Sequence, residues 1–191
     1  MMDKISNYTS MVLHLERQEL ESSKTGSASP QIYGQLLAIY LLINDLPNAK
    51  LLWKRIPKDI KESNSEIQAV WDVGIKISLR QFSSIYSLID QTQWPSHLNN
   101  IMNCIKESTR DRLLTLISKA YTSYEFKDLV LCLGLSETET MEKISKLGWT
   151  YEHDNGFVVP TKQDSSNDDA PVPSFDQLMT KLTEYVSFLE N

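Results

Sequence analysis

The side chains best suited to chemistry in this 191-residue chain are three histidines and two cysteines, and their spacing builds no reactive site. His14, His97 and His153 fall in different predicted elements, and the sequence contains no H-x-H, H-E-x-x-H or paired C-x-x-C pattern that would bring metal ligands together. Neither Cys104 nor Cys132 has a histidine nearby in sequence to act as an activating base. We therefore expect no metal centre, and we predict two reduced cysteines within helices.

Motifs for phosphate binding or for a serine nucleophile are missing as well. None of the six glycines stands in a G-x-G-x-x-G or G-x-x-x-x-G-K arrangement, which would cradle a phosphate group, and no G-x-S-x-G occurs. The acidic pairs Asp168-Asp169 and Glu137/Glu139 are explained by a solvated surface or by a helix start. The sequence therefore favours a protein without enzymatic activity and without a cofactor.

The charge of the chain excludes some partners. There are 19 basic and 25 acidic residues, a net charge of −6, which argues against nucleic acid or an anionic membrane as the partner. The longest unbroken apolar run, Leu36 to Ile43, is far shorter than the roughly 20 residues that span a bilayer. The polar N-terminus offers no apolar core of a signal peptide, so we expect an intracellular protein.

Helical periodicity runs through residues 1–92 and predicts a bundle of TPR-like helical repeats. Apolar residues recur at three- and four-residue spacing after helix starts at Ser29, Pro47, Ser65 and Phe82. These helices form two similar pairs, because the apolar set Ile32, Leu36, Tyr40 and Leu42 recurs 35 positions later as Ile67, Trp71, Ile75 and Ile77. A period of about 34 residues is typical of helix-turn-helix repeats, which stack because one pair cannot bury its apolar face alone. The residues expected to face inward on the third helix are Ile67, Val70, Trp71, Gly74 and Ile75.

Residues 93–160 predict a second region, which ends in a winged helix at about residues 121–160. A long helical stretch begins at Ser96 and leads into two short helices, Glu125 to Leu133 and Glu137 to Leu147. Ser136 and Glu139 form an S-x-x-E capping box at the start of the second short helix. The strands predicted to close the unit are Trp149 to His153 and Phe157 to Pro160, joined by a turn at Asp154-Asn155-Gly156.

The charge of this winged helix is unusual for a protein that binds DNA. Residues 121–162 contain four basic residues against seven acidic ones, a local charge of −3. A DNA reader places its second helix in the major groove and needs lysine and arginine around that helix to contact phosphates. We therefore predict that the module contacts protein, and a nucleic-acid-binding winged helix is the alternative from another class of protein.

After the winged helix, residues 161–173 predict a flexible linker and residues 174–191 a C-terminal amphipathic helix. The linker is rich in Ser, Asn and Asp and contains Pro171 and Pro173. The helix carries an apolar stripe, which has to be buried against something. We expect it to dock either on a partner, in a bundle built with other chains, or on the body of its own chain. The stripe consists of Phe175, Leu178, Met179, Leu182, Tyr185, Val186 and Leu189.

Helical repeats that run without a break into a winged helix resemble the PCI domain. This family supplies scaffold subunits of the proteasome lid, the COP9 signalosome and translation initiation factor 3. The stretch from Arg112 through Ala120-Tyr121, the turn Leu133 to Ser136, and Gly148-Trp149 are similar to the core of the family. The segments that favour the signalosome branch are Tyr33 to Leu42 (YGQLLAIYLL), Leu52 to Pro57 (LWKRIP), Ala120 to Ser123 (AYTS) and Leu182 to Asn191 (LTEYVSFLEN).

The resemblance implies a mostly α fold and a non-catalytic scaffold role in the signalosome, which removes NEDD8 from cullins and so regulates cullin-RING ubiquitin ligases. It also implies a zinc isopeptidase in another subunit, subunit 3 as the neighbour, and a location in the cytoplasm and nucleus. A PCI subunit of the proteasome lid is the alternative of the same class. The partner contacts that it implies on the wing are Trp149, Tyr151, Phe157 and Val159. Those implied for the C-terminal helix, within a helical bundle of the complex, are Phe175, Leu178, Met179, Leu182, Tyr185, Val186 and Leu189.

Overall fold

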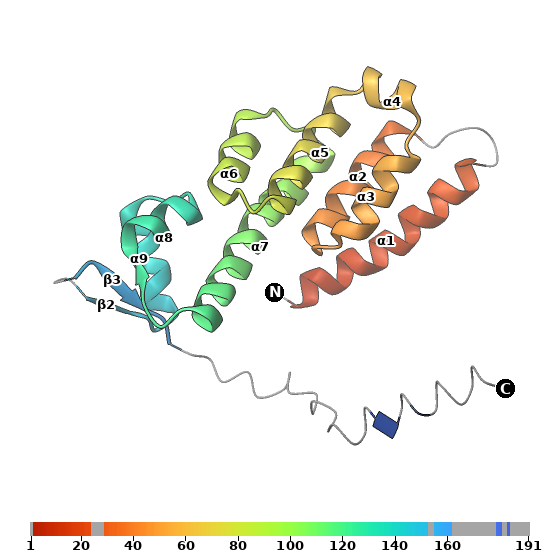
Figure 1. Ribbon diagram of the computed structural model, residues 1–191. Coiled ribbons are helices and arrows are strands. Elements are labelled where there is room, and N and C mark those ends of the chain that lie inside the picture. The colour runs from red at the N-terminus through yellow and green to blue at the C-terminus, as the bar shows by residue number, and fades with distance from the viewer. Residues whose placement is uncertain (1, 24–28, 153–154, 162–178, 181–182, 184–191) are drawn as a thin grey trace. The chain divides into compact units, whose positions relative to one another are not determined.

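The computed structural model of the chain describes residues 2–23, 29–152, 155–161, 179–180 and 183 (Figure 1). The chain divides into two compact units, residues 1–161 and residues 162–191. In the second unit the hydroxyl of Thr183 donates a hydrogen bond to the carbonyl of Met179 at 2.8 Å. The elements of the first unit are α1 (Met2–Ser23), α2 (Pro30–Leu42), α3 (Leu46–Arg55), α4 (Lys58–Ser63), α5 (Ser65–Ser78), α6 (Phe82–Gln91), α7 (Ser96–Ala120), β1 (Tyr124–Glu125), α8 (Phe126–Leu133), α9 (Glu137–Lys146), β2 (Thr150–Glu152) and β3 (Phe157–Val159).

The core of the helical body is built around α2, a helix with apolar residues on every side. Pro30 occupies its first turn, where the missing N–H of proline is not needed. The helix packs against α1, α3, α5 and α7. Its completely buried side chains include Leu36, Leu37, Ile39 and Leu41. A helix that is apolar all round has to be surrounded, so α2 organises the helices that enclose it.

The predicted helix pairs are present as α2–α3 and α5–α6, which confirms the mostly α fold. The short helix α4 lies between the pairs and is not predicted by the periodicity. The prediction that Ile75 faces inward is wrong, because its side chain is 38% exposed. The buried stripe of α5 runs through Val70, Val73, Gly74 and Ile77. Successive residues of a helix are about 100° apart, so Ile75 points away from this stripe.

One helix, α7, belongs to both the helical body and the winged helix (Figure 1). It runs for 25 residues without a break. In its first half, Met102 and Ile105 are buried in the core of the helical body. In its second half, Leu113 and Ile117 are buried in a separate core, which belongs to the winged helix. The two parts of the first unit therefore share a rigid element.

The winged helix contains α8, α9 and a three-stranded antiparallel sheet with the strand order β1-β3-β2. The capping box is confirmed, since the amide of Ser136 donates to Glu139 Oε2 at 3.0 Å and the amide of Glu139 donates to Ser136 Oγ at 3.3 Å. The hairpin of β2 and β3 is confirmed as well, and Gly156 in its turn has a φ of 69°. His153 and Asp154 of the predicted hairpin lie outside the described residues. The sequence does not predict β1, because two residues carry no alternation to detect.

The turn after α8 packs closely against Tyr86 of α6, and so joins the winged helix to the helical body. Gly134 ends α8 with a left-handed φ of 57°, and a Cβ at this position would lie 2.5 Å from Cδ2 of Tyr86. Gly148 has a φ of 70°, but nothing lies within 4 Å of a Cβ there. Both Gly→Ala changes strain the backbone, but only Gly134→Ala also forces a buried ring to move. We predict that Gly134→Ala lowers the free energy of unfolding by about 1–3 kcal/mol more than Gly148→Ala does.

Urea unfolding followed by circular dichroism measures this difference. Gly148→Ala serves as the matched control, because it carries the strain of a left-handed backbone without the clash. Equal losses for Gly134→Ala and Gly148→Ala would show that the contact with Tyr86 does not constrain the turn.

Candidate protein-interaction surface

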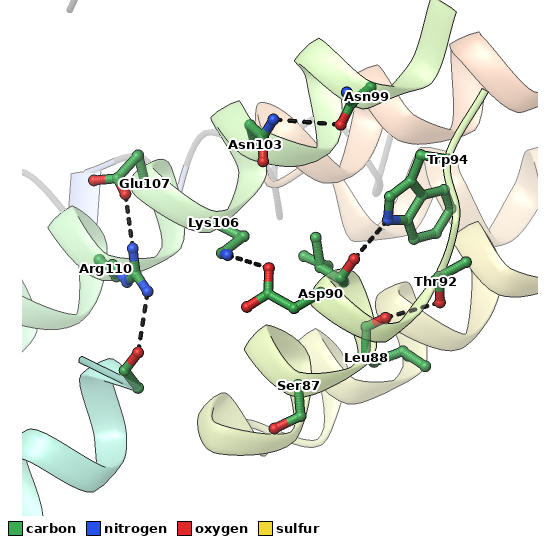
Figure 2. Close-up of polar contacts among 12 residues, drawn as sticks. Ser87, Leu88, Asp90, Thr92, Trp94, Asn99, Asn103, Lys106, Glu107 and Arg110 are labelled. Atoms are coloured by element: carbon green, nitrogen blue, oxygen red, sulfur yellow. Dashed lines mark hydrogen bonds and ion pairs between the residues drawn. The ribbon is translucent and has the colours of Figure 1, made fainter. Parts of the chain in front are cut away.

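A buried arginine joins the winged helix to the helical body (Figure 2). Arg110 of α7 is only 7% exposed. Its Nε donates a hydrogen bond to the carbonyl of Leu133 at 3.0 Å, and its Nη2 donates to the carbonyl of Gly134 at 3.2 Å. These carbonyls stand at the C-terminal end of α8, where acceptors have no partner within the helix and the helix dipole is negative. Arg110 therefore caps α8 from a different helix.

The guanidinium of Arg110 is held from two further sides. Glu107, one turn earlier on α7, accepts a hydrogen bond from Nη1 of Arg110 at 2.7 Å. The ring centroid of Tyr86, on α6, lies 4.8 Å from the guanidinium carbon, within the range of a cation–π contact. A buried charge is tolerated only with such partners. Residues of α6, α7 and α8 thus meet around one side chain.

Two ion pairs hold α6 and α9 against α7. Nζ of Lys106 lies 2.5 Å from Oδ1 of Asp90, which ties α7 to α6 (Figure 2). Nζ of Lys143, on α9, lies 3.0 Å from Oε2 of Glu107, so that Glu107 bridges two cations. Sequence reasoning does not find this set, because Glu107 and Arg110 have the pattern of ordinary charges on a helix. The nearest signal is that Arg110 stands between the two apolar clusters of α7.

Glu107 has an altered acidity because of these contacts. Its partial burial by itself would raise the pKa of the carboxyl group. The hydrogen bonds and positive charges of Lys143 and Arg110 outweigh that effect and hold the pKa of Glu107 below its ordinary value of 4.5. The carboxylate is therefore ionised at neutral pH and can bridge the two cations.

The strand register divides the wing into a buried and an exposed face. Val158 of β3 is completely buried and pairs with Tyr151 of β2, so both side chains face the core of the winged helix. The preceding residue, Phe157, points the other way and is 40% exposed. It pairs with Glu125 on one side and Glu152 on the other. The exposed face of the sheet therefore presents an aromatic ring between two carboxylates.

The wing residues predicted to contact a partner differ in their exposure. Phe157 is exposed, whereas Val159 is half-buried. Tyr151 is also half-buried, and its ring lies 5.0 Å from that of Phe126. Trp149 is buried in the core of the winged helix, so it supports the sheet from within. Of these four residues, Phe157 is therefore the one that is exposed to a partner.

The residues predicted to form the apolar stripe of the C-terminal helix belong to the second unit. Met179 is 48% exposed. Its neighbour Thr180 and the more distant Thr183 are exposed as well. The predicted contacts that lie outside the described residues are Phe175, Leu178, Leu182, Tyr185, Val186 and Leu189. Their role in partner binding stays a prediction from the sequence.

The helix that would enter a DNA groove has an acidic surface. On α9 the side chains of Glu137, Glu139 and Glu142 are exposed. The ammonium group of Lys143 is paired with Glu107 and is therefore not available to a phosphate. Since DNA binding depends on the neutralisation of phosphates by cations, this surface opposes contact with a duplex.

The described residues do not assemble a metal centre. Among them, no group of three or more His, Cys, Asp and Glu side chains is placed to hold a metal ion. Cys104 on α7 and Cys132 on α8 lie within helices, as predicted, and both are free cysteines. In the part of the chain that the structure describes, no helix combines the length and the apolar character needed to cross a membrane.

The fold and these surfaces define a class of protein. Paired helices form a body that is joined to a winged helix by a shared helix and a buried charge cluster. The exposed wing combines apolar and acidic side chains, which suits contacts with protein. This is the architecture of a PCI-type assembly subunit.

Comparison with known proteins gives the family. The family model described as the CSN8/PSMD8/EIF3K family matches residues 27–169. The COP9 signalosome complex subunit 8 of Xenopus laevis is 45% identical over 179 residues, which cover 92% of this chain and 89% of the relative. The protein of that name from Drosophila melanogaster is 32% identical over 189 residues, which cover 98% of this chain and 99% of the relative. The chain belongs to the CSN8/PSMD8/EIF3K family, and its resemblance to the signalosome branch is confirmed.

The contacts of Arg110 with Glu107, Tyr86 and the carbonyls of Leu133 and Gly134 form a joint between the helical body and the winged helix. We predict that this joint weakens in acid. The pKa of Glu107 is lowered in the folded chain, so its ionised form stabilises the fold above about pH 4.5, and this contribution is lost as the pH falls through the lowered pKa. Glu107→Gln should therefore lower the free energy of unfolding at neutral pH. The deficit relative to the unsubstituted chain should shrink as the pH falls below about 4.5. Urea titrations at a series of pH values measure it.

Glu142→Gln provides the control for this pH series, because Glu142 is an exposed carboxylate on α9. Its effect on the free energy of unfolding should be small and should not follow the titration of Glu107. A deficit of Glu107→Gln that stays constant from neutral to acid pH would show that the charge of Glu107 does not stabilise the joint.

Proposed function

We propose that this chain is a non-catalytic scaffold subunit of the COP9 signalosome. The observation that carries the proposal is the similarity to signalosome subunit 8 over nearly the whole length, which reaches 98% of this chain in the Drosophila melanogaster relative. By the resemblance to PCI proteins, this complex removes NEDD8 from cullins and regulates cullin-RING ubiquitin ligases. The chain acts there by holding other subunits in place, in the cytoplasm and in the nucleus.

The exposed face of the wing is the surface that we assign to a lateral contact, with subunit 3 as the neighbour that the family resemblance implies. Phe157 offers an apolar centre, and Glu125 and Glu152 lie on either side of it. An apolar centre with a polar rim is the usual anatomy of a specific interface. The carboxylates favour a partner with basic residues opposite them.

The joint at Arg110 supports the scaffold role. Because Arg110 connects α7 to the end of α8, the wing is presented in one orientation before any partner binds. Pre-organisation of this kind lowers the entropy that is lost on association. A subunit whose task is to set the geometry of an assembly benefits from a contact surface that does not reorient.

A non-catalytic role is supported by the positions of the histidines. A zinc isopeptidase needs a convergent set of histidine and carboxylate ligands. His14 is on α1 and His97 is on α7, and no such set exists among the described residues. The purified chain alone is expected to leave a NEDD8–cullin conjugate intact. Hydrolysis of the conjugate by the pure chain would make it an enzyme.

A nucleic-acid-binding winged helix is the rival from another class. It is disfavoured by the exposed carboxylates of α9 and by the pairing of Lys143 with Glu107. Binding to a DNA duplex that falls steeply with added salt would support this rival, whereas the acidic surface favours no binding at physiological ionic strength.

Phe157→Glu is predicted to reduce incorporation into the signalosome at least ten-fold. The change places a third carboxylate at the centre of the wing face, between Glu125 and Glu152. Loss of a central apolar contact costs on the order of 2 kcal/mol or more in binding free energy. Affinity purification of the tagged chain from cells, followed by quantitative mass spectrometry, measures the co-purifying subunits. The same experiment distinguishes the signalosome from the proteasome lid.

Leu13→Glu on α1 is the matched control for Phe157→Glu, because Leu13 is 65% exposed and lies outside the wing. It is expected to co-purify with the same subunits as the unsubstituted chain. Thermal unfolding of both variants checks that each remains folded. Undiminished recovery of signalosome subunits with Phe157→Glu would remove the wing from the interface.

Deletion of residues 174–191 is predicted to weaken incorporation while the first unit stays folded. The apolar stripe in the sequence of this segment suits a helical bundle with other subunits. Both apolar cores that the structure describes lie within residues 1–161, so their unfolding temperature should change little. The double change Leu182→Asp and Val186→Asp should have the same effect on co-purification as the deletion.

The polar side of the same sequence provides the control. Thr180→Asp combined with Thr183→Asp adds two charges to the segment without changing the apolar stripe. This variant is expected to assemble normally. If the deletion and the Leu182/Val186 variant also assembled normally, the C-terminal segment would have no role in the bundle.

A further inference from the structure

Helices α3 and α5 neighbour each other in the helical body (Figure 1). An apolar groove lies between them. Its volume is about 530 Å³. Leu41 and Ala49, which line it, are buried side chains of the core. One of its edges is formed by Ile75 of α5 and by Leu79, the residue that follows this helix, which are 38% and 60% exposed. The groove is therefore a place where apolar surface of the body is left uncovered.

The groove is preformed rather than a gap between loose helices. Gly74 lines it, and a Cβ there would lie 3.0 Å from Cδ2 of Leu41, so glycine allows α5 to approach α2 closely. Trp71, which also lines the groove, stacks on Trp53 with ring centroids 4.9 Å apart and an interplanar angle of 6°. Nζ of Lys61 lies 4.8 Å from the ring centroid of Trp53. These contacts hold the walls of the groove in place.

The lining of the groove suits apolar side chains of a protein better than a small molecule. A small-molecule site has several convergent polar groups that fix the orientation of the ligand. Here the side chains of Lys50 and Ser78 are the polar ones in the lining that the structure describes. Leu79 directly follows α5, and its amide donates a hydrogen bond to the carbonyl of Ile75 at 2.9 Å, so the two side chains lie on one side of the helix end, one turn from each other. Such a pair matches the spacing of apolar residues on a second helix.

The edge of the groove on α3 carries positive charge. Lys50 lines the groove, Lys54 lies one turn further along α3, and both are exposed. Among the described residues, Lys50 and Lys54 have no ion-pair partner. The guanidinium of Arg55, by contrast, pairs with Glu19 at 2.7 Å. Asp72 is exposed on α5 and is the nearest carboxylate in sequence to Ile75. In a chain of net charge −6, two adjacent lysines without a carboxylate partner make α3 a basic edge.

We propose that this groove binds an acidic amphipathic helix of another protein. Apolar side chains of that helix, spaced three and four residues apart, pack against Ile75, Leu79 and the Trp71 ring. Glutamate and aspartate side chains along one flank face Lys50 and Lys54. A helix fits better than an extended strand, because the groove is bordered by helices and offers no strand edge for pairing. This groove lies on the helical body, so it is a different surface from the wing, and its proposed partner is separate from the contact that we assign to the wing.

Synthetic peptides provide the test. A fluorescein-labelled helix of about 18 residues, with leucine at helical spacing and glutamate on the flanks, is titrated with the full chain, and fluorescence anisotropy is measured. A second peptide replaces every glutamate by lysine. The glutamate peptide is expected to bind at least ten-fold more tightly than the lysine peptide. Leu79→Asp and the double change Lys50→Glu with Lys54→Glu should each weaken its binding at least ten-fold.

Matched controls separate the groove from other exposed positions. Leu13→Asp tests an apolar residue of similar exposure on α1, at 65% against 60% for Leu79. Lys119→Glu tests an exposed lysine on α7. Both controls should bind the glutamate peptide as the unsubstituted chain does. Unchanged thermal unfolding of Leu79→Asp would show that the loss of binding is local.

Three results would overturn the proposal. The first is no binding of the glutamate peptide at millimolar chain concentration. The second is equal affinity for the glutamate and lysine peptides, or equal effects of Leu79→Asp and Leu13→Asp. The third is self-association of the chain in analytical ultracentrifugation that Leu79→Asp abolishes, because the groove would then be occupied by a second copy.

Discussion

The guanidinium of Arg110 carries a full positive charge into a site that is only 7% exposed. Removing an ion from water costs several kcal/mol unless partners in the protein replace the lost hydration. Here the replacement comes from the carbonyls of Leu133 and Gly134, the carboxylate of Glu107 and the ring of Tyr86. These groups belong to three different helices or to the turn after one of them. A displacement of the winged helix would separate the guanidinium from the carbonyls of Leu133 and Gly134, and Glu107 from Lys143, so the contact selects one arrangement of the two parts.

The small size of the winged helix explains why such a joint matters. Its strands are two and three residues long, and sheets of this kind are marginal on their own. Part of its core is supplied by Leu113, Leu114 and Ile117 of α7, a helix whose first half is buried in the other core. The winged helix therefore cannot turn away from α7 without losing its own apolar contacts. Stability and orientation depend on the same helix, and this suits a protein that sets the geometry of an assembly.

Local patterns in the sequence predict local structure well. The capping box lies within four consecutive residues, Ser136 to Glu139, and it is present with both hydrogen bonds. The exposure of a side chain depends on neighbours that are far away in the sequence. The spacing of apolar residues gives no information about these neighbours. Ile75 fits a repeat pattern but lies outside the stripe that faces α2, and Arg110 has no local feature that marks it as buried. The groove between α3 and α5 and the contacts of Arg110 depend on such distant neighbours, so the sequence patterns do not predict them.

The two candidate surfaces of the first unit differ in the sign of their charge. On the wing, Phe157 lies between Glu125 and Glu152. Lys50, by contrast, lines the groove of the helical body, and Lys54 lies one turn further along α3. Like charges brought together in an interface oppose binding, so a basic partner suited to the wing is disfavoured at the groove, and an acidic partner at the wing. An apolar centre alone would not make this distinction, because both surfaces have one. The charged borders therefore favour different partners for the two proposed contacts, and the connection through α7 and Arg110 would fix how those partners are oriented.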